Sequence, residues 1–283
     1  MTVITPVYNG EKFVNRCYDM LKSQTFKEWE WVVVDDGSTD RTANVVRNID
    51  DPRIQLISYP VNAGRGFART AAINASRGEW IVIWDIDDMN FPDRLEKINE
   101  AQTGGYDFFC SYAIVVDNNV NVKGVRGFYR ATKAFPKYFV HPTLACRTDL
   151  ARDIGYSPIY HTGEDFTIML VLAANYNGCF FEDALAIYQE DREVTLEKAI
   201  STNWSQLQQV RTLYKRGILH VGYLSYIIMV CKWYSKLLIL NLMRITPSIY
   251  LKTVNMRTYG EIALDWKLSQ ERKLFLDTLT KVI

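Results

Sequence analysis

The stretch Trp80-Ile81-Val82-Ile83-Trp84-Asp85-Ile86-Asp87-Asp88 places five large apolar residues directly before a group of three carboxylates. An apolar run of this length predicts a strand buried on both faces. Ligands of open α/β sheets bind outside the carboxyl ends of the strands, and hard cations such as Mg²⁺ and Mn²⁺ prefer oxygen ligands and phosphates. The stretch therefore predicts a metal–diphosphate site at Asp85, Asp87 and Asp88. The alternative at this point is that these acids only cap a helix that begins near Pro92.

Composition narrows the class of protein. The chain has 283 residues, of which 48% are hydrophobic, so it can bury a full core. Its formal net charge of +1 provides no basic field, and nucleic acid is therefore not an expected partner. Five scattered cysteines without a Cys-x-x-Cys pair indicate reduced thiols. With a first segment that reads as a strand and not as a signal peptide, we expect a cytoplasmic location.

Strands and helices alternate through the first ninety residues, which is the pattern of a parallel, doubly wound sheet. The strand expected at 29–34 ends in Asp35-Asp36-Gly37-Ser38-Thr39-Asp40. Because the carboxyl ends of parallel strands share one edge, Asp36 and Asp87 should lie on the same rim. Before the stretch at 80–84, the expected strands are 3–4, 29–34 and 53–59, and the expected helices are 11–23, 41–49 and 67–75.

The pattern changes after the acidic stretch. A helix is expected at 92–101, with Arg94 and Lys97 on its polar side. The turn Asn118-Asn119 after an expected strand at 107–116 predicts a hairpin, so the sheet should be mixed from there. The basic segment 124–137 could neutralise a phosphate or form a solvated loop. Further elements are expected as an extended segment at 141–146, helices at 148–154 and 166–175, and a strand at 180–188.

Glu164 and Asp165 precede the apolar helix expected at 166–175. Carboxylates are favoured in a first helical turn, so capping is one interpretation of this pair. With this pair, four motifs in order resemble the family 2 glycosyltransferases of the GT-A fold, over about residues 1–190. The motifs are Thr5-Pro6-Val7-Tyr8-Asn9, Asp35-Asp36-Gly37-Ser38-Thr39-Asp40, Asp85-Ile86-Asp87-Asp88 and Glu164-Asp165.

The resemblance implies an α/β fold of GT-A (Rossmann-like) type, with a mixed, mainly parallel sheet flanked by helices. The catalytic domain would comprise residues 1–192, followed by a helical C-terminal extension at 193–283. Such enzymes transfer a sugar from a nucleotide-sugar, usually a UDP-sugar, with inversion at the anomeric carbon. The acceptor would be a hydroxyl of a glycan or lipid-linked molecule in cell-surface polysaccharide biosynthesis.

The same resemblance assigns the donor site. Pro6, Tyr8, Asn9 and Asp36 would hold the nucleoside, with Tyr8 against the uracil and Asp36 accepting a hydrogen bond from the base. Arg65 or Arg69, in the segment 62–74, would assist the base or the phosphates.

Asp85 and Asp87 would hold Mn²⁺ or Mg²⁺ on the diphosphate, with Asp87 the direct ligand and Asp85 nearer the ribose. A divalent cation takes up charge on the leaving nucleoside diphosphate, so one carboxylate suffices as general base. Asp165 would be that base, and Glu164 would belong to the substrate-binding set. The Gln-x-x-Arg-Trp motif of processive synthases is missing, which predicts transfer of a single sugar.

The last ninety residues predict helices, and residues 250–283 are expected to form a polar, mixed-charge helical tail. A helix is expected within 193–217, and the 14 residues 218–231 contain no charged side chain. That run is shorter than the roughly 20 residues that span a bilayer. Lys232, Lys236 and Arg244 then interrupt a second apolar block, a pattern that fits a helix lying at a membrane surface through 218–250. The protein would then be peripheral at the inner face of the cell membrane; the alternative is a helix packed on the catalytic domain.

Two other functions are compatible with the motifs. A nucleotidyltransferase on a similar fold should carry a Gly-rich phosphate loop near its first strand, which the turn at 6–10 does not resemble. A catalytically silent nucleotide-sugar or glycan-binding module needs no general base, and retention of Asp165 argues against it. Among the three histidines, His141 and His220 are expected to be structural, and His161 is a candidate for the acceptor site.

Overall fold

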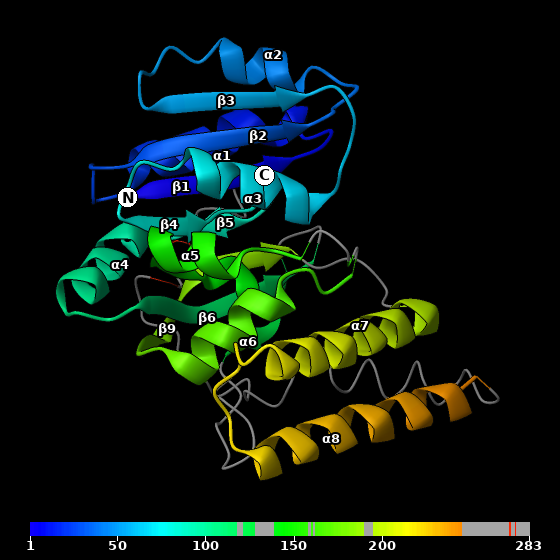
Figure 1. The fold of residues 1–283 in the computed structure, drawn as a ribbon. Helices are drawn as coiled ribbons and strands as arrows, with labels where there is room; N and C mark the ends of the chain where they lie inside the picture. The colour runs from blue at the N-terminus through cyan, green and yellow to red at the C-terminus, as the bar shows by residue number, and fades with distance from the viewer. Residues whose placement is uncertain are drawn as a thin grey trace.

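The computed structural model describes residues 1–117, 121–127, 139–157, 160, 162–189 and 195–244, together with Arg272 and Phe275. A mixed sheet with the strand order β3-β2-β1-β4-β8-β6-β9-β5 runs through the molecule, and β7 pairs with β6 (Figure 1). Helices cover both faces of this sheet. The predicted α/β architecture is therefore confirmed.

The first half is the parallel part of the sheet, in which β1 lies between β2 and β4 and β2 pairs with β3. The strands and helices alternate as the sequence predicted. They are β1 (Thr2–Val7), α1 (Glu11–Ser23), β2 (Glu30–Asp36), α2 (Thr42–Arg47), β3 (Ile54–Tyr59), α3 (Arg65–Ala75) and β4 (Trp80–Ile83).

Alternate residues of the central strands point to opposite faces, which produces two hydrophobic cores. Val3 and Val33 pack with buried residues of α1 and α2, whereas Ile4 and Val32 pack with buried residues of α3. This explains why the strands read as continuous apolar runs: both of their faces are covered by helices.

The second half makes the sheet mixed. Strand β8 runs antiparallel between β4 and β6, and the hairpin expected after 116 is confirmed because β7 runs antiparallel to β6. Strand β9 is parallel to β6, and the two-residue β5 runs antiparallel to β9. The elements are β5 (Met89–Asn90), α4 (Arg94–Thr103), β6 (Phe108–Val116), β7 (Val122–Arg126), η1 (His141–Thr143), β8 (Ala145–Arg147), α5 (Thr148–Ile154), α6 (Phe166–Asn175) and β9 (Gly178–Gln189).

Two local expectations were wrong. The segment expected to be extended at 141–146 begins as the 3-10 turn η1, in which the Thr143 hydroxyl donates to the carbonyl of Val140 at 2.7 Å. Arg94 is buried and not on a polar face. Its Nη2 donates to the carbonyl oxygens of Ile83 at 2.9 Å and Pro142 at 2.8 Å, so the guanidinium ties the end of β4 to η1.

The C-terminal extension contains α7 (Leu196–Lys215) and α8 (Tyr223–Leu242). Most of the two apolar blocks of the sequence forms one continuous helix, α8, which packs on α7 below the sheet (Figure 1). Tyr226 stacks on Tyr214 at 3.9 Å between ring centroids, and Trp233 Nε1 donates to Gln206 at 3.1 Å. By length and a mean hydropathy of 1.3, α8 is also long and apolar enough to cross a membrane.

Some expectations concern residues outside the described part of the chain. They are the turn at 118–119, most of the basic segment 124–137, His161, and the polar tail expected at 250–283 apart from Arg272 and Phe275.

Candidate active site

The turns after β1 and β2 are tied to each other by side chains. Asn9 has a positive φ of 52°, which asparagine tolerates better than most residues. Its Oδ1 accepts from the Thr39 amide at 2.8 Å, and its own amide donates to Ser38 Oγ at 2.9 Å. Asn9 therefore has a structural role, since these hydrogen bonds hold the two turns together. The neighbouring Tyr8 is 50% exposed, and Pro6 is buried in β1.

Asp36 anchors the loop that leads into α3. Its two carboxylate oxygens accept the amides of Ala63 and Gly64, each at 2.8 Å. The turn around it is close-packed: Gly37 has φ +75°, and a Cβ there would lie 2.6 Å from the Asn62 nitrogen. A carboxylate offers about four acceptor positions, so Asp36 retains capacity for a further donor. The structure thus fixes the position of Asp36 at the end of β2.

The three carboxylates of the opening stretch follow β4 at the same edge of the sheet. Asp85 and Asp87 are partly buried, whereas Asp88 is buried. The backbone is held here because Arg16 Nη2, from α1, donates to the Asp87 carbonyl at 2.8 Å. Burial, followed by the charges of Asp85 and Asp87, raises the pKa of Asp88 well above its usual range. Because Asp88 is closed off from solvent, Asp85 and Asp87 are the carboxylates of this turn that are available to a cation.

Mg²⁺ is usually held by one or two carboxylates plus substrate phosphates and water. Asp85 and Asp87 fit such a site because both come from one turn and both keep part of their surface open. Among residues in the described ranges, no group of three or more His, Cys, Asp or Glu side chains could hold a metal ion. The donor set therefore fits a cation that is completed by a diphosphate, and does not fit an all-protein metal cage.

Arg69 joins this turn to the Glu164-Asp165 motif. Its Nη2 donates to Asp85 Oδ1 at 2.9 Å, and its Nη1 donates to Glu164 Oε1 at 3.1 Å. Arg65 also approaches Glu164 Oε1, at 3.3 Å from its Nε. Burial opposes ionisation of Asp85, but the charge and hydrogen bond of Arg69 outweigh it and lower the pKa of that carboxyl. Both arginines of the expected segment thus contact acids of the site.

Tyr156 is a site residue that the sequence did not reveal. It is buried, its ring lies 5.5 Å below the Arg69 guanidinium, and its hydroxyl lies 2.7 Å from His141 Nε2. Burial, followed by the charge of Arg69, lowers the pKa of His141 well below its usual range, so the ring is neutral. This agrees with the structural role expected for His141. No motif marks Tyr156, because its neighbours are close only in space.

Asp165 occupies the residue before α6, but its side chain does not cap that helix. Glu164 does not cap it either, because its carboxylate pairs with the two arginines. Burial, followed by the charge of Glu164, raises the pKa of Asp165 to about 6, against the opposing effect of Arg69. The capping interpretation of these acids is therefore wrong. A carboxylate with a pKa of about 6 is suited to accept a proton near neutral pH.

Comparison with known proteins places this chain among related sequences. Residues 2–179 match the sequence profile of glycosyl transferase family 2. The chain is 41% identical over 227 residues to the succinoglycan biosynthesis protein ExoO of Rhizobium meliloti, covering 71% of this chain and 63% of ExoO. It is 27% identical over 203 residues to an uncharacterized glycosyltransferase of Methanocaldococcus jannaschii, covering 67% of this chain and 70% of that protein.

Solved structures share the fold. Residues 1–349 of S. aureus TarS, in complex with UDP-GlcNAc, match with a TM-score of 0.63 and 22% identity over 82% of this chain and 71% of that chain. The Pyrobaculum calidifontis mannosyltransferase PcManGT, in complex with GDP-Man and Mn²⁺, matches with a TM-score of 0.62 and 18% identity, covering 99% of this chain and 79% of that chain. With the profile match over residues 2–179, the chain belongs to glycosyl transferase family 2 and has a GT-A type fold.

Proposed function

We propose that this protein is an inverting, metal-dependent glycosyltransferase that moves one sugar from a UDP-sugar to a hydroxyl of a glycan or lipid-linked acceptor. The observation that supports this best is the Arg69 contact between Asp85 and Glu164, because it brings the donor turn next to Asp165. The similarity to ExoO, named for succinoglycan biosynthesis, supports a role in the synthesis of a polysaccharide.

The donor would bind along the carboxyl edge of the sheet. Tyr8 offers a half-exposed ring on which a base can stack, and Asp36 keeps acceptor capacity for a base N–H. Asp85 and Asp87 would hold Mn²⁺ or Mg²⁺, which when bound neutralises charge on the departing diphosphate. The Mn²⁺ in the PcManGT structure supports this assignment by similarity of fold.

Asp165 would accept the proton of the attacking hydroxyl as that oxygen forms its bond to the anomeric carbon. The bond to the diphosphate oxygen breaks on the opposite side, and the diphosphate leaves with the electron pair. The pKa of about 6 keeps Asp165 ionised at pH 7 while leaving it basic enough to take the proton. Arg69 and Glu164 fix the start of α6 and hold this carboxylate in place.

A silent binding module is the competing proposal, and a base of raised pKa beside the donor turn argues against it. A nucleotidyltransferase would need a Gly-rich phosphate-binding loop after β1, and this chain has none there. The amides of Asn9 and Gly10 donate instead to the hydroxyls of Ser38 and Thr42, and the Asn9 side chain accepts from the Thr39 amide.

The deciding experiment is calorimetric binding of UDP with and without Mn²⁺. We expect Mn²⁺-dependent binding that Asp87→Asn weakens by at least about tenfold, because one direct ligand loses its charge. Asp19→Asn is the matched control, since the Asp19 side chain is exposed and its ion pair with Lys22 lies on the surface. Absence of UDP binding under every condition would reject the donor assignment, and equal binding by Asp87→Asn would reject the metal site.

We also propose that the protein associates with the inner surface of a cell membrane through α8 and the residues around it, 218–250. The outward face of α8 exposes apolar side chains that no described residue covers, including Leu224, Leu238 and Leu242. A bilayer surface would bring the protein to a lipid-linked acceptor.

A further inference from the structure

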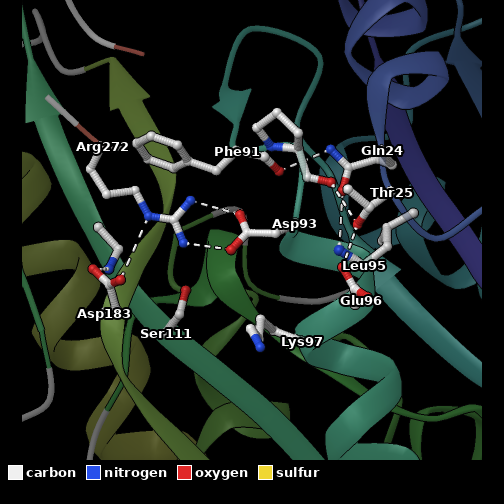
Figure 2. A network of polar contacts seen from close by, with 12 residues as sticks. Gln24, Thr25, Phe91, Asp93, Leu95, Glu96, Lys97, Ser111, Asp183 and Arg272 are labelled. Carbon is white, nitrogen blue, oxygen red and sulfur yellow. Dashed lines mark hydrogen bonds and ion pairs between the residues drawn. The ribbon is translucent and has the colours of Figure 1, made fainter. Parts of the chain in front are cut away.

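Two residues close to the C-terminus lie against the segment that follows the acidic turn. Arg272 is buried, and its guanidinium forms two hydrogen bonds to Asp93, at 2.6 and 2.8 Å. Its Nε also lies 3.6 Å from Asp183 Oδ2 on β9. Figure 2 shows Arg272 reaching between these two acids. The contact joins residues 179 positions apart, although the sequence suggested only a polar tail here.

The same two residues cover Phe91. The Arg272 guanidinium lies 4.3 Å from the centroid of the Phe91 ring, and the Phe275 ring lies 4.8 Å from it. Phe91 is itself fully buried, and its amide donates to the Leu185 carbonyl of β9 at 3.1 Å. Four residues separate Asp88 from Asp93, and they include β5 and Phe91. The contacts of Arg272 and Phe275 therefore act directly on the segment that leaves the acidic turn.

The other side of this segment is held by the end of α1. Gln24 Nε2 donates to the Phe91 carbonyl at 3.0 Å, and Gln24 Oε1 accepts the Leu95 amide at 3.1 Å. The Thr25 amide donates to the Pro92 carbonyl at 2.8 Å. In Figure 2 these contacts lie on one side of Phe91 and Asp93, and Arg272 lies on the other. The segment is thus held from both sides, once by α1 and once by the C-terminal residues.

We propose that Arg272, with Phe275, is a positioning residue that holds the turn carrying Asp85 and Asp87 in the shape that binds the metal–diphosphate group. The reason is mechanical. A two-residue strand, β5, gives the turn little support of its own, and a buried arginine fork is a rigid restraint because both hydrogen bonds depend on one planar group. This inference rests on the proposed function only for the identity of the ligand.

The competing explanation is that the Arg272–Asp93 pair only stabilises the fold. A similar ion pair far from the site serves as a control that distinguishes this explanation from positioning of the turn. Arg53 forms the same two-bonded fork with Asp51, at 3.0 and 2.7 Å, and its guanidinium lies 3.7 Å from the centroid of Trp29. Arg53 precedes β3, at the amino end of the strand and therefore at the edge of the sheet away from the site. Arg53→Gln removes a comparable pair without touching the acidic turn.

The test measures amide hydrogen exchange of residues 88–96 and Mn²⁺-dependent UDP binding in the full chain, at a temperature where every variant is folded. We expect Arg272→Gln to accelerate exchange at Phe91 and Arg94 and to weaken Mn²⁺-dependent binding by about tenfold, as losses in the outer shell of metal sites do. Arg272→Lys keeps the positive charge but cannot form both hydrogen bonds to Asp93, so its exchange rates and its UDP affinity should lie between those of wild type and Arg272→Gln. Arg53→Gln should change neither readout.

Asp93→Asn and the double variant with Arg272→Gln complete the design. If the two residues act as one pair, the double variant should bind metal–UDP no more weakly than Arg272→Gln alone. Unchanged exchange at 88–96 in both Arg272 variants, or equal effects of Arg53→Gln, would overturn the proposal. If wild type bound no UDP, the donor assignment would fail, while the exchange measurement would still decide whether Arg272 holds the turn.

Discussion

Nη2 of Arg69 lies 2.9 Å from Oδ1 of Asp85, and through its other nitrogen the same buried guanidinium reaches Glu164. The arginine therefore links two acidic motifs that are about eighty residues apart in the chain. Removal of one member of a buried, paired group leaves an uncompensated charge behind. This makes Arg69 the residue on which both the donor turn and the start of α6 depend.

Arg69→Met should lower the free energy of unfolding by about 3–5 kcal/mol, because Asp85 would lose its arginine partner and buried Glu164 would keep only its pair with the exposed Arg65. Urea unfolding at pH 7 measures this. Arg69→Lys should lose less, since it keeps one charge but cannot donate to both acids at once. For comparison, Arg53→Gln should cost about 1 kcal/mol, as its pair is more exposed. A loss below 1 kcal/mol for Arg69→Met would show that the link carries little of the stability.

Tyr8→Ala should weaken UDP binding roughly 5- to 100-fold, because stacking of a base on an aromatic ring contributes about 1–3 kcal/mol. Stability should hardly change, since half of the Tyr8 surface is exposed and its loss leaves no buried cavity. Calorimetry on Tyr8→Ala and Tyr8→Phe measures the effect, and the phenylalanine variant should bind like wild type. Tyr106→Ala is the control for removal of an exposed tyrosine. Wild-type affinity in Tyr8→Ala would remove the ring from the donor site.

Asp165→Asn should bind UDP as wild type does and lose transfer by about 10²- to 10⁴-fold, the usual contribution of a general base. Binding and turnover must be measured on the same preparation. Loss of UDP binding together with activity would identify Asp165 as structural and remove it from the chemistry.

The rate of transfer should also fall as the pH drops below about 6, because Asp165 accepts a proton only in its ionised form and its pKa is raised to about 6. Glu164 contributes to that raised value, whereas Arg69 and Arg65 oppose it. Glu164→Gln should therefore move the acid limb of kcat/KM to lower pH. Glu197→Gln, a change in the first turn of α7, should leave it in place. An acid limb that stays fixed in Glu164→Gln would assign it to another group.

The elements and motif positions of this fold follow closely from sequence periodicity. The continuous apolar runs at β2 and β4 identified strands buried on both faces, and the acidic turns after them do share one edge of the sheet. The limits of α1, α5 and α6 were also predicted, because their apolar spacing and their flanking turns agree. Local sequence patterns are sufficient to predict an element where apolar spacing and the flanking turn residues determine its limits.

The tertiary roles of charged residues could not be predicted in the same way. Arg94 looked like a surface residue of α4 but satisfies carbonyls at the end of β4 and in η1. Tyr156 and Arg272 carry no motif, and they enter the description only through contacts with residues far away in the chain. The local sequence does not distinguish a buried arginine from an exposed one, because the partners of the buried one come close to it only when the chain folds.

The outward face of α8 leads to the last prediction, which tests membrane association. Residues 218–244 include three basic residues and no acidic one, and Leu224 and Leu238 of α8 are 72% and 63% exposed. We expect the full chain to bind vesicles that contain anionic lipid, and to release them at high salt because the basic residues supply part of the attraction. Vesicle flotation at two salt concentrations measures this binding.

Leu224→Glu with Leu238→Glu should reduce vesicle binding at least about tenfold, since burial of each apolar side chain contributes about 1.5–3 kcal/mol. Val122→Glu, on the exposed part of β7, is the control for added charge and should bind like the wild type. If wild type floats with neither anionic nor neutral vesicles at low salt, the exposed face serves another contact, and self-association measured by light scattering would then identify a second copy as its partner. Equal loss in the control would mean that general charge, and not this face of α8, determines the binding.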